Sequence, residues 1–171
     1  MILPPDMVIF DCDGVIVDSE PITNRVMQAS LARHGLALEF DEIMRLFVGG
    51  TMQGVMKLAI DMGAKLPDDW LDQIYGEMFV SLAEQVEPIP GIVPVLDALD
   101  AVGIPYAIGS NGPHAKMDVT LTRTGLKQRF EGRIHSREDV PNPKPAPDVY
   151  LRAAQSLGIA PERCAVIEDS A

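Results

Sequence analysis

The sequence has few cysteines, no long apolar run and no excess of basic side chains. Cys12 and Cys164 are its two cysteines, and both lie in apolar stretches, which is typical of reduced thiols and not of a disulfide framework. No stretch approaches the roughly 18 apolar residues of a membrane-spanning helix, and residues 1–5 lack the features of a signal peptide. We therefore expect a soluble protein of the cytoplasm that does not associate with membranes.

Basic residues are outnumbered, since 14 Lys and Arg stand against 25 Asp and Glu for a formal net charge of −11. So acidic a chain is a poor ligand for nucleic acid, and we predict no such partner. It can still bind a phosphate group, but only with local donors and a divalent cation. Hydrophobic residues make up 47% of the 171 positions, too many for a disordered chain. The length suits one core domain with a small insertion.

Short apolar runs, each followed by polar residues, recur along the chain. They span 7–10, 104–108 and 164–167, with a weaker candidate around Ile134. Continuous runs of this length are typical of strands buried on both faces of a parallel sheet. Helical patterns over 94–99 and 148–154 separate them, and each is followed by a glycine suited to a helix end. This alternation predicts an α/β domain whose ligands bind beyond the carboxyl ends of the strands.

The segment 19–88 interrupts the alternation because it contains helical patterns alone. Four helices are expected there, over 24–34, 41–47, 52–62 and 68–85. A purely helical block inside an α/β domain indicates an inserted cap, and prolines at 88 and 90 mark the return to the core. We therefore predict a core of residues 1–18 and 89–171, with residues 19–88 as a helical cap insertion.

Two carboxylates follow the first expected strand. Asp11 and Asp13 are two residues apart, so a strand-like backbone places both side chains on one face, and Gly14 allows a tight turn. Paired carboxylates suit a nucleophile with a general acid, or a divalent-metal site. An Asp-rich turn without chemistry is the alternative. An EF-hand is excluded because Val15 occupies its third ligand position.

Three further segments carry groups that suit a phosphate or a cation. Ser110 and Asn111 precede an expected helix, where a hydroxyl and backbone amides can hold an anion, although Asn-Gly also occurs in hairpin turns. Lys144 stands among four prolines that stiffen the backbone around its ammonium, although a lone lysine there would be read as a surface residue. Glu168 and Asp169 follow the last strand and have oxygen atoms that can bind Mg²⁺. The alternative is that they only cap the N-terminus of a helix.

In combination, these four segments resemble the motifs of the haloacid dehalogenase (HAD) superfamily of phosphotransferases. The matching residues are 11–15 with 18–20 for the first motif, Ser110 for the second, Lys144 in Lys-Pro-Ala-Pro-Asp for the third, and Glu168 with Asp169 for the fourth. The resemblance spans the whole chain and includes a helical insertion after the first motif, as in the small-cap subgroup of β-phosphoglucomutase and phosphoglycolate phosphatase. The stretch 110–117 is most similar to bacterial sugar phosphatases of the 6-phosphogluconate type.

The resemblance implies a three-layer, Rossmann-like parallel-sheet core with an inserted helical cap. It also implies Mg²⁺-dependent hydrolysis of a small phosphorylated metabolite, a sugar phosphate in particular. Asp11 would attack phosphorus and form an aspartyl-phosphate, while Asp13 would protonate the leaving alcohol and then deprotonate the hydrolytic water. Ser110, the Asn111 amide and Lys144 would bind the phosphoryl oxygens and stabilise the charge of the transition state.

The metal ligands that the resemblance implies are the Asp11 carboxylate, the Asp13 backbone carbonyl and Asp169, with Glu168 acting directly or through water. The family pattern also implies a further helix and strand beyond the fourth motif. We therefore expect the C-terminal end of the core to be truncated in these 171 residues. The strand at 164–167 would then become an apolar edge that promotes association.

The sequence leaves other functions open. A phosphosugar mutase of the same family would carry an arginine in the cap loop at 48–52, and its absence there favours simple hydrolysis. A non-enzymatic phospho-acceptor signalling domain also uses an aspartate, clustered carboxylates, a hydroxyl and a lysine, but it needs no helical lid. Dehalogenation is disfavoured by Asp13, because halide departure needs no acid. The loop at 47–51 is expected to set substrate specificity, while the substrate and the oligomeric state stay open.

Overall fold

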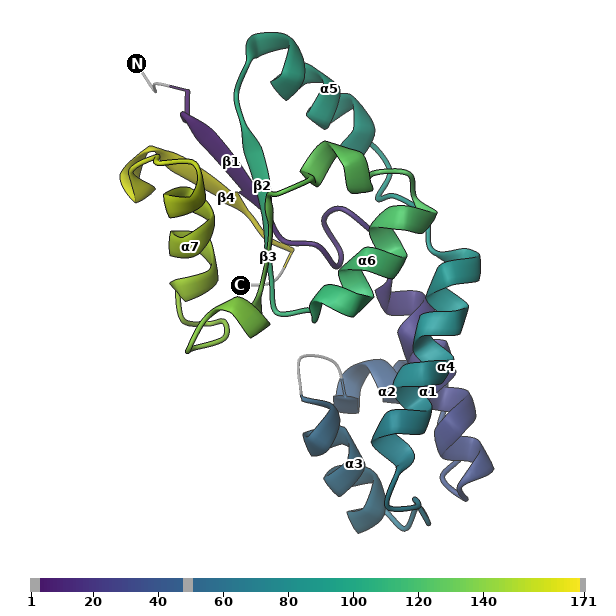
Figure 1. The fold of residues 1–171 in the computed structure, drawn as a ribbon. Helices are drawn as coiled ribbons and strands as arrows, with labels where there is room; N and C mark the ends of the chain where they lie inside the picture. The colour runs from purple at the N-terminus through teal and green to yellow at the C-terminus, as the bar shows by residue number, and fades with distance from the viewer. Residues whose placement is uncertain (1–3, 48–50, 170–171) are drawn as a thin grey trace. The chain divides into compact units, whose positions relative to one another are not determined.

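The computed structural model describes residues 4–47 and 51–169. The chain divides into two compact units, of which one comprises residues 1–19 and 86–171 and the other residues 20–85 (Figure 1). We refer to the first as the α/β unit, because it contains the strands, and to the second as the helical unit. The loop predicted to set specificity falls partly on residues 48–50, which lie outside the described residues.

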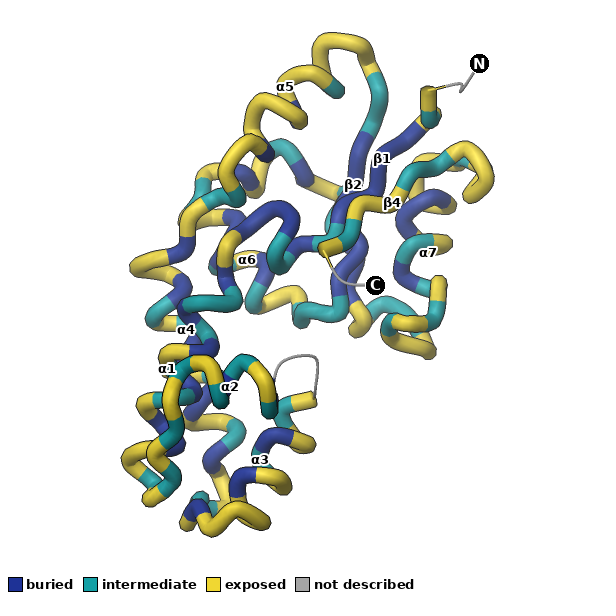
Figure 2. The backbone as a smooth tube through the Cα atoms, turned by 180° about the vertical axis from the view of Figure 1, so that it is seen from behind, coloured by how far each residue is buried: buried dark blue, intermediate teal, exposed yellow. Residues whose placement is uncertain are grey.

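The α/β unit is built on a parallel sheet with the strand order β3-β2-β1-β4. The strands are β1 (Met7–Phe10), β2 (Tyr106–Ser110), β3 (Ile134–Ser136) and β4 (Cys164–Ile167). β1 and β2 are buried along their whole length, whereas β4, at an edge of the described sheet, is partly exposed (Figure 2). Because β2 and β4 pair with opposite sides of β1, the strand order reverses there. Ligands of open α/β sheets bind at such a switch point.

Helices cover both faces of this sheet (Figure 1). α5 (Ile92–Val102), α6 (His114–Arg123) and the 3₁₀ helix η1 (Lys127–Phe130) lie on one side, and α7 (Asp148–Ser156) lies on the other. On the α7 face, apolar side chains of β1 and β2 pack with Ala153 and Ala154. On the opposite face, the Tyr106 ring packs edge-on against Phe10 and Phe130, with centroid distances of 6.3 and 5.3 Å. These layers confirm the predicted Rossmann-like α/β core.

The helical unit has a core of its own. It contains α1 (Glu20–Arg33), α2 (Phe40–Phe47), α3 (Met52–Asp61) and α4 (Trp70–Gln85). Trp70 is fully buried among apolar side chains from all four helices, including Leu31, Ile43 and Val55. Its indole N–H donates to the Ser30 hydroxyl at 2.9 Å, so the polar atom of this large side chain is satisfied inside the core.

Among the element boundaries that differ from the sequence-based expectation, two involve a proline. The second strand begins at Tyr106 instead of residue 104, because Pro105 has no N–H for the ladder, although its carbonyl accepts from the Val8 N–H at 3.1 Å. The first helix begins at Glu20, four positions before the expected start at 24. Pro21 is tolerated there because the first N–H groups of a helix have no partner within the helix.

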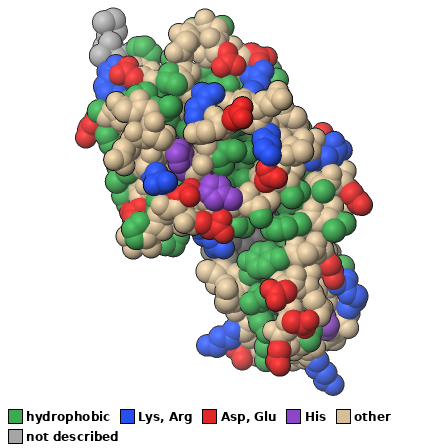
Figure 3. Space-filling model, in the orientation of Figure 1, with side chains coloured by type: hydrophobic (Ala, Val, Ile, Leu, Met, Phe, Trp, Pro, Cys, Tyr) green, Lys and Arg blue, Asp and Glu red, His purple; other side chains and the backbone are tan. Residues whose placement is uncertain are grey.

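The surface carries charges of both signs. On the face shown in Figure 3, acidic and basic side chains are interspersed, and the described residues on that face form no continuous basic patch. None of the helices within 4–47 and 51–169 is long and apolar enough to cross a membrane.

Candidate active site

The sequence segments singled out above meet at the carboxyl ends of β1, β2 and β4. The Asp11 N–H, directly after β1, donates to the Ile167 carbonyl of β4 at 2.9 Å, which brings the ends of these strands together. Lys144 comes from the loop before α7 and reaches the same place. Its Nζ lies 3.0 Å from Asp11 Oδ1 and 2.6 Å from Glu168 Oε1. Three predicted site residues from distant parts of the chain are therefore in direct contact at the switch point.

Asn111 holds the loop that carries Lys144. Its side-chain oxygen accepts the Lys144 backbone N–H at 2.9 Å, and its side-chain NH₂ donates to the Lys144 carbonyl at 3.3 Å. The Lys144 ammonium also lies 4.7 Å from the centroid of the Tyr150 ring, within cation–π range. The lysine thus has a fixed position, to which the Asn111 side chain contributes in addition to the surrounding prolines. From the sequence, a role was predicted for the Asn111 amide alone.

The turn after β2 is compact and precedes a helix. Ser110 is buried, and its Oγ accepts the Gly112 N–H at 3.0 Å, while the Gly112 carbonyl accepts from the Ser136 hydroxyl at 2.7 Å. The alternative of an Asn-Gly hairpin is wrong, because β2 pairs in parallel with β3 and the chain continues into α6. Ser110 therefore stands where the backbone turns from a strand toward a helix N-terminus, the geometry expected for anion binding.

An acidic cluster lies at the centre of the site. One ligand oxygen from each of Asp11, Glu168 and Asp169 lies within 4.8 Å of the other two. Glu168 Oε1 accepts from Lys144 and from the Tyr150 hydroxyl. Glu168 Oε2, by contrast, is buried without a hydrogen-bond partner among the described residues, a costly state unless a cation binds it. These carboxylate oxygens fit a hard divalent cation such as Mg²⁺.

Burial and the neighbouring ammonium act in opposite directions on these carboxyl groups. Burial raises the pKa of Asp11 to about 6. The Lys144 ammonium and the Cys12 N–H, which donates to Asp11 Oδ1 at 2.7 Å, act to lower this pKa and offset part of the rise. Burial also acts to raise the pKa of Glu168, but hydrogen bonds from Lys144 and Tyr150 hold it below its usual value. Burial raises the pKa of the adjacent Cys12 thiol well above its ordinary value, so this thiol stays protonated.

The Asp13 side chain has different neighbours. Its Oδ1 accepts from the Ser19 hydroxyl at 2.5 Å and lies 2.8 Å from Lys116 Nζ in the first turn of α6. Ser19 and Lys116 lie in the stretches 18–20 and 110–117 that carry the HAD resemblance, but their contacts with Asp13 were not predicted, and no role was predicted for Tyr150. Lys116 follows Ser110 by six residues in the sequence. The direction of its side chain, however, depends on the orientation of α6, which only the structure shows.

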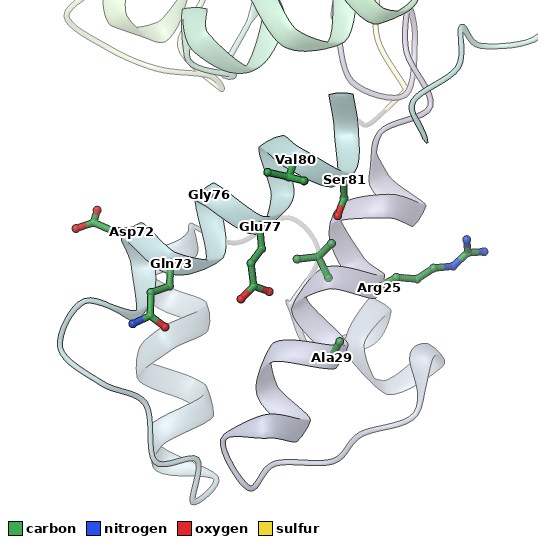
Figure 4. Close-up of a pocket in the computed structure, with 9 residues that line it drawn as sticks. Arg25, Ala29, Asp72, Gln73, Gly76, Glu77, Val80 and Ser81 are labelled. Carbon is green, nitrogen blue, oxygen red and sulfur yellow. The ribbon is translucent and has the colours of Figure 1, made fainter. Parts of the chain in front are cut away.

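A groove in the helical unit has no connection to this chemistry. It lies between α1 and α4, has a volume of about 760 Å³, and is shown in Figure 4. Gly76 leaves space along its α4 side, with Arg25 and Ala29 on the α1 side. None of the predicted site residues lines it. The candidate active site is therefore the cluster at the switch point of the α/β unit.

The fold and this cluster define a Rossmann-like α/β hydrolase that carries an inserted helical segment. Over residues 5–171 the chain matches the family of haloacid dehalogenase-like hydrolases, and it belongs to that family. The predicted family is thereby confirmed.

Named relatives and solved structures agree with this assignment. The chain is 28% identical over 167 residues to the 6-phosphogluconate phosphatase of Escherichia coli (strain K12), covering 96% of this chain and 74% of that protein. It is 33% identical over 165 residues to hexitol phosphatase A of the same organism, covering 95% and 73%. A HAD family hydrolase from Deinococcus radiodurans R1, solved with bound phosphate and sodium, is 41% identical with a TM-score of 0.81, covering 98% of this chain and 73% of that chain. The predicted class, phosphoric monoester hydrolase, is confirmed at this level.

Proposed function

We propose that this protein hydrolyses a small phosphorylated sugar, with Mg²⁺ as cofactor, through an aspartyl-phosphate formed on Asp11. The observation that carries the proposal is the direct contact of Lys144 with both Asp11 and Glu168 at the switch point of the sheet. The similarity to enzymes named for 6-phosphogluconate and for hexitol phosphates supports a sugar phosphate as the substrate class.

In the first step, an Asp11 carboxylate oxygen attacks phosphorus while the bond from phosphorus to the substrate alcohol breaks. Asp13 gives a proton to the departing oxygen. In the second step, water attacks the aspartyl-phosphate, Asp13 takes a proton from it, and inorganic phosphate leaves with the Asp11 carboxylate restored. Lys144 neutralises part of the charge on both the nucleophile and the phosphoryl group, which lessens their repulsion. Ser110 and the Asn111 amide bind phosphoryl oxygens.

Asp11, Glu168 and Asp169 would hold the Mg²⁺ ion, with the Asp13 backbone carbonyl as a further ligand. The buried Glu168 Oε2, which no group of the described residues satisfies, supports this assignment. When bound, the ion would neutralise charge that develops on the phosphoryl oxygens.

We also propose that residues 19–88 act as an inserted cap that carries substrate specificity. The support is that residues 20–85 form a compact unit with its own apolar core, joined to the α/β unit at 19–20 and at 85–86. Loops on a scaffold of this kind commonly carry the groups that discriminate between substrates.

Gly14 offers a test of the metal site. Its φ is +75°, and a Cβ at this position would lie 2.1 Å from Asp169 Oδ2, so no larger residue fits without displacing that carboxylate. We predict that Gly14→Ala raises the Mg²⁺ concentration for half-maximal activity by about tenfold or more, the usual cost of disturbing the support of a metal ligand. The measurement is a Mg²⁺ titration of phosphate release.

Gly132→Ala is the matched control, because Gly132 has a φ of +71° and a Cβ there would have no neighbour within 4 Å among the described residues. It carries the same backbone strain without the clash. An equal Mg²⁺ requirement in Gly14→Ala and Gly132→Ala would contradict the assignment of Asp169.

The proposed function itself is tested by a substrate screen in the presence of Mg²⁺. The panel contains p-nitrophenyl phosphate, 6-phosphogluconate, a hexitol phosphate and fructose 1-phosphate, with released inorganic phosphate as the readout. We expect continuous turnover of at least one sugar phosphate, with kcat on the order of 1 to 10³ s⁻¹. A signalling domain would instead take up one phosphoryl group per chain without turnover, and a mutase would isomerise the sugar phosphate instead of releasing phosphate.

A further inference from the structure

We propose that Lys116 is a positioning residue that, together with Ser19, fixes the orientation of the Asp13 carboxylate. In that orientation Oδ2 is the oxygen that exchanges a proton with the leaving alcohol and then with water. The inference rests on the proposed function, because Asp13 acts as acid and base in that reaction.

The geometry around Asp13 is asymmetric. Lys116 Nζ lies 2.8 Å from Oδ1, and the Ser19 hydroxyl donates to the same atom at 2.5 Å. Within 4–47 and 51–169, these two contacts are the polar partners of the carboxylate, and neither involves Oδ2. Oδ2 instead faces Gly112, where a Cβ would come within 3.6 Å of it. The missing side chain at Gly112 leaves space beside this second oxygen.

The Asp13 carboxylate needs such an anchor. The terminal torsion of an aspartate is broad and has no sharply preferred rotamer, so the orientation of its two oxygens depends on their contacts. Ser19 lies six residues further along the same segment, whereas Lys116 comes from α6, and the two donors bind Oδ1 from separate elements. Without Lys116, a single contact would remain, and the carboxylate could rotate away from the leaving oxygen.

Lys116 is also better placed for this role than an ordinary surface lysine. Its side chain is 20% exposed, and the adjacent Met117 is buried, which anchors this turn of α6 against the α/β core. A comparison within the same unit is Lys127, whose side chain is 52% exposed and forms an ion pair with Asp118 at 2.5 Å. The pair of Lys127 with Asp118 is a Lys–Asp ion pair like that of Lys116 with Asp13, but it lies outside the site, so it serves as a matched control.

The role predicts a loss that depends on the leaving group. An alkoxide from a sugar phosphate is a poor leaving group and needs a proton from Asp13, whereas p-nitrophenolate departs without one. The ratio kcat/KM reports the steps up to cleavage of the bond between phosphorus and the alcohol. A misplaced Asp13 should therefore lower kcat/KM for the sugar phosphate far more than for p-nitrophenyl phosphate.

The experiment compares wild type with Lys116→Met, Lys116→Arg and Lys127→Met on p-nitrophenyl phosphate and on the best sugar phosphate of the screen. For Lys116→Met we expect kcat/KM to fall about a hundredfold on the sugar phosphate, the cost of a displacement near 1 Å. On p-nitrophenyl phosphate the fall should stay below about tenfold, since little acid catalysis is lost there. Lys116→Arg should restore most of the difference, and Lys127→Met should match wild type.

Two further measurements separate positioning from a structural role. The inhibition constant of inorganic phosphate should be unchanged in Lys116→Met, because Ser110, Asn111 and Lys144 bind the phosphoryl group. If Lys116→Met lowers the midpoint of thermal unfolding too far for assay, Ser19→Ala removes the other Oδ1 contact and should show the same dependence on the leaving group.

Equal losses on both substrates, or no loss on the sugar phosphate, would overturn the role of Lys116 while leaving the proposed function in place. A wild-type protein that releases phosphate from neither substrate would instead contradict the proposed function, and the inference would fall with it.

Discussion

Asp11→Asn is expected to abolish turnover while leaving the fold intact. Asparagine has nearly the same shape as aspartate, but its amide is a poor nucleophile, so no aspartyl-phosphate can form. Loss of an attacking group costs on the order of 10⁴-fold or more in kcat. The measurement is phosphate release by the purified variant under saturating Mg²⁺ and substrate. A variant that keeps more than about a hundredth of the wild-type rate would show that the covalent mechanism is wrong.

The free energy of unfolding provides the accompanying control. Burial raises the pKa of Asp11, so the charged carboxylate is held where its environment disfavours charge. Replacing it with a neutral amide should therefore not lower the free energy of unfolding at neutral pH by more than about 1 kcal/mol, as read from urea midpoints. Asp118→Asn, at an exposed ion pair with Lys127, should leave both activity and stability unchanged. A loss of activity in that variant would mean that the assay reports general damage.

Removal of divalent cations is the second change with a large expected effect. The carboxylates of Asp11, Glu168 and Asp169 lie close together, and the Lys144 ammonium contacts the first two of them. Such an excess of negative charge repels a phosphate dianion. Treatment with EDTA should therefore reduce phosphate release to background, and added Mg²⁺ should restore it.

The chelated protein should keep its circular dichroism spectrum, because the apolar cores of both units are formed without the carboxylates of the site. Binding of Mg²⁺, measured by calorimetry, should be weakened in Asp169→Asn, which tests the ligand assignment without an activity assay. Full activity after exhaustive EDTA treatment would eliminate the metal from the proposed mechanism.

Local patterns in the sequence were sufficient for the strands of the core. The runs at 7–10 and 164–167 coincide with β1 and β4, of which β1 is buried along its whole length and β4 is partly exposed. The second strand was predicted at 104–108 but lies at 106–110. The apolar pattern begins before Pro105, which has no N–H to donate to a neighbouring strand. Helix positions were also predictable in outline, but the start of α1 was placed four residues late, although the buried Ile22 lies in its first turn.

The candidate site was predictable where its residues follow strands directly. Asp11 and Glu168 come after β1 and β4, and the carboxyl ends of parallel strands share one edge of the sheet. The HAD motifs then placed Ser110 and Lys144 beside them. By contrast, the contacts of the Tyr150 hydroxyl with Glu168 and of the Lys116 ammonium with Asp13 were not predicted, because a tyrosine or lysine on a helix is most often a packing or surface residue.

The α/β class and the parallel strands could be predicted from the sequence alone, because burial and periodicity are properties of short segments, and the motifs indicated the candidate site residues. The tertiary structure decided which atoms of those residues meet. The pairing of β1 with both β2 and β4 sets Lys144 between Asp11 and Glu168, and it buries Glu168 Oε2 where the described part of the chain offers no partner. The orientation of α6 brings Lys116 to Asp13. Such contacts join residues far apart in the chain, so they follow from strand order and helix direction, which no local pattern encodes.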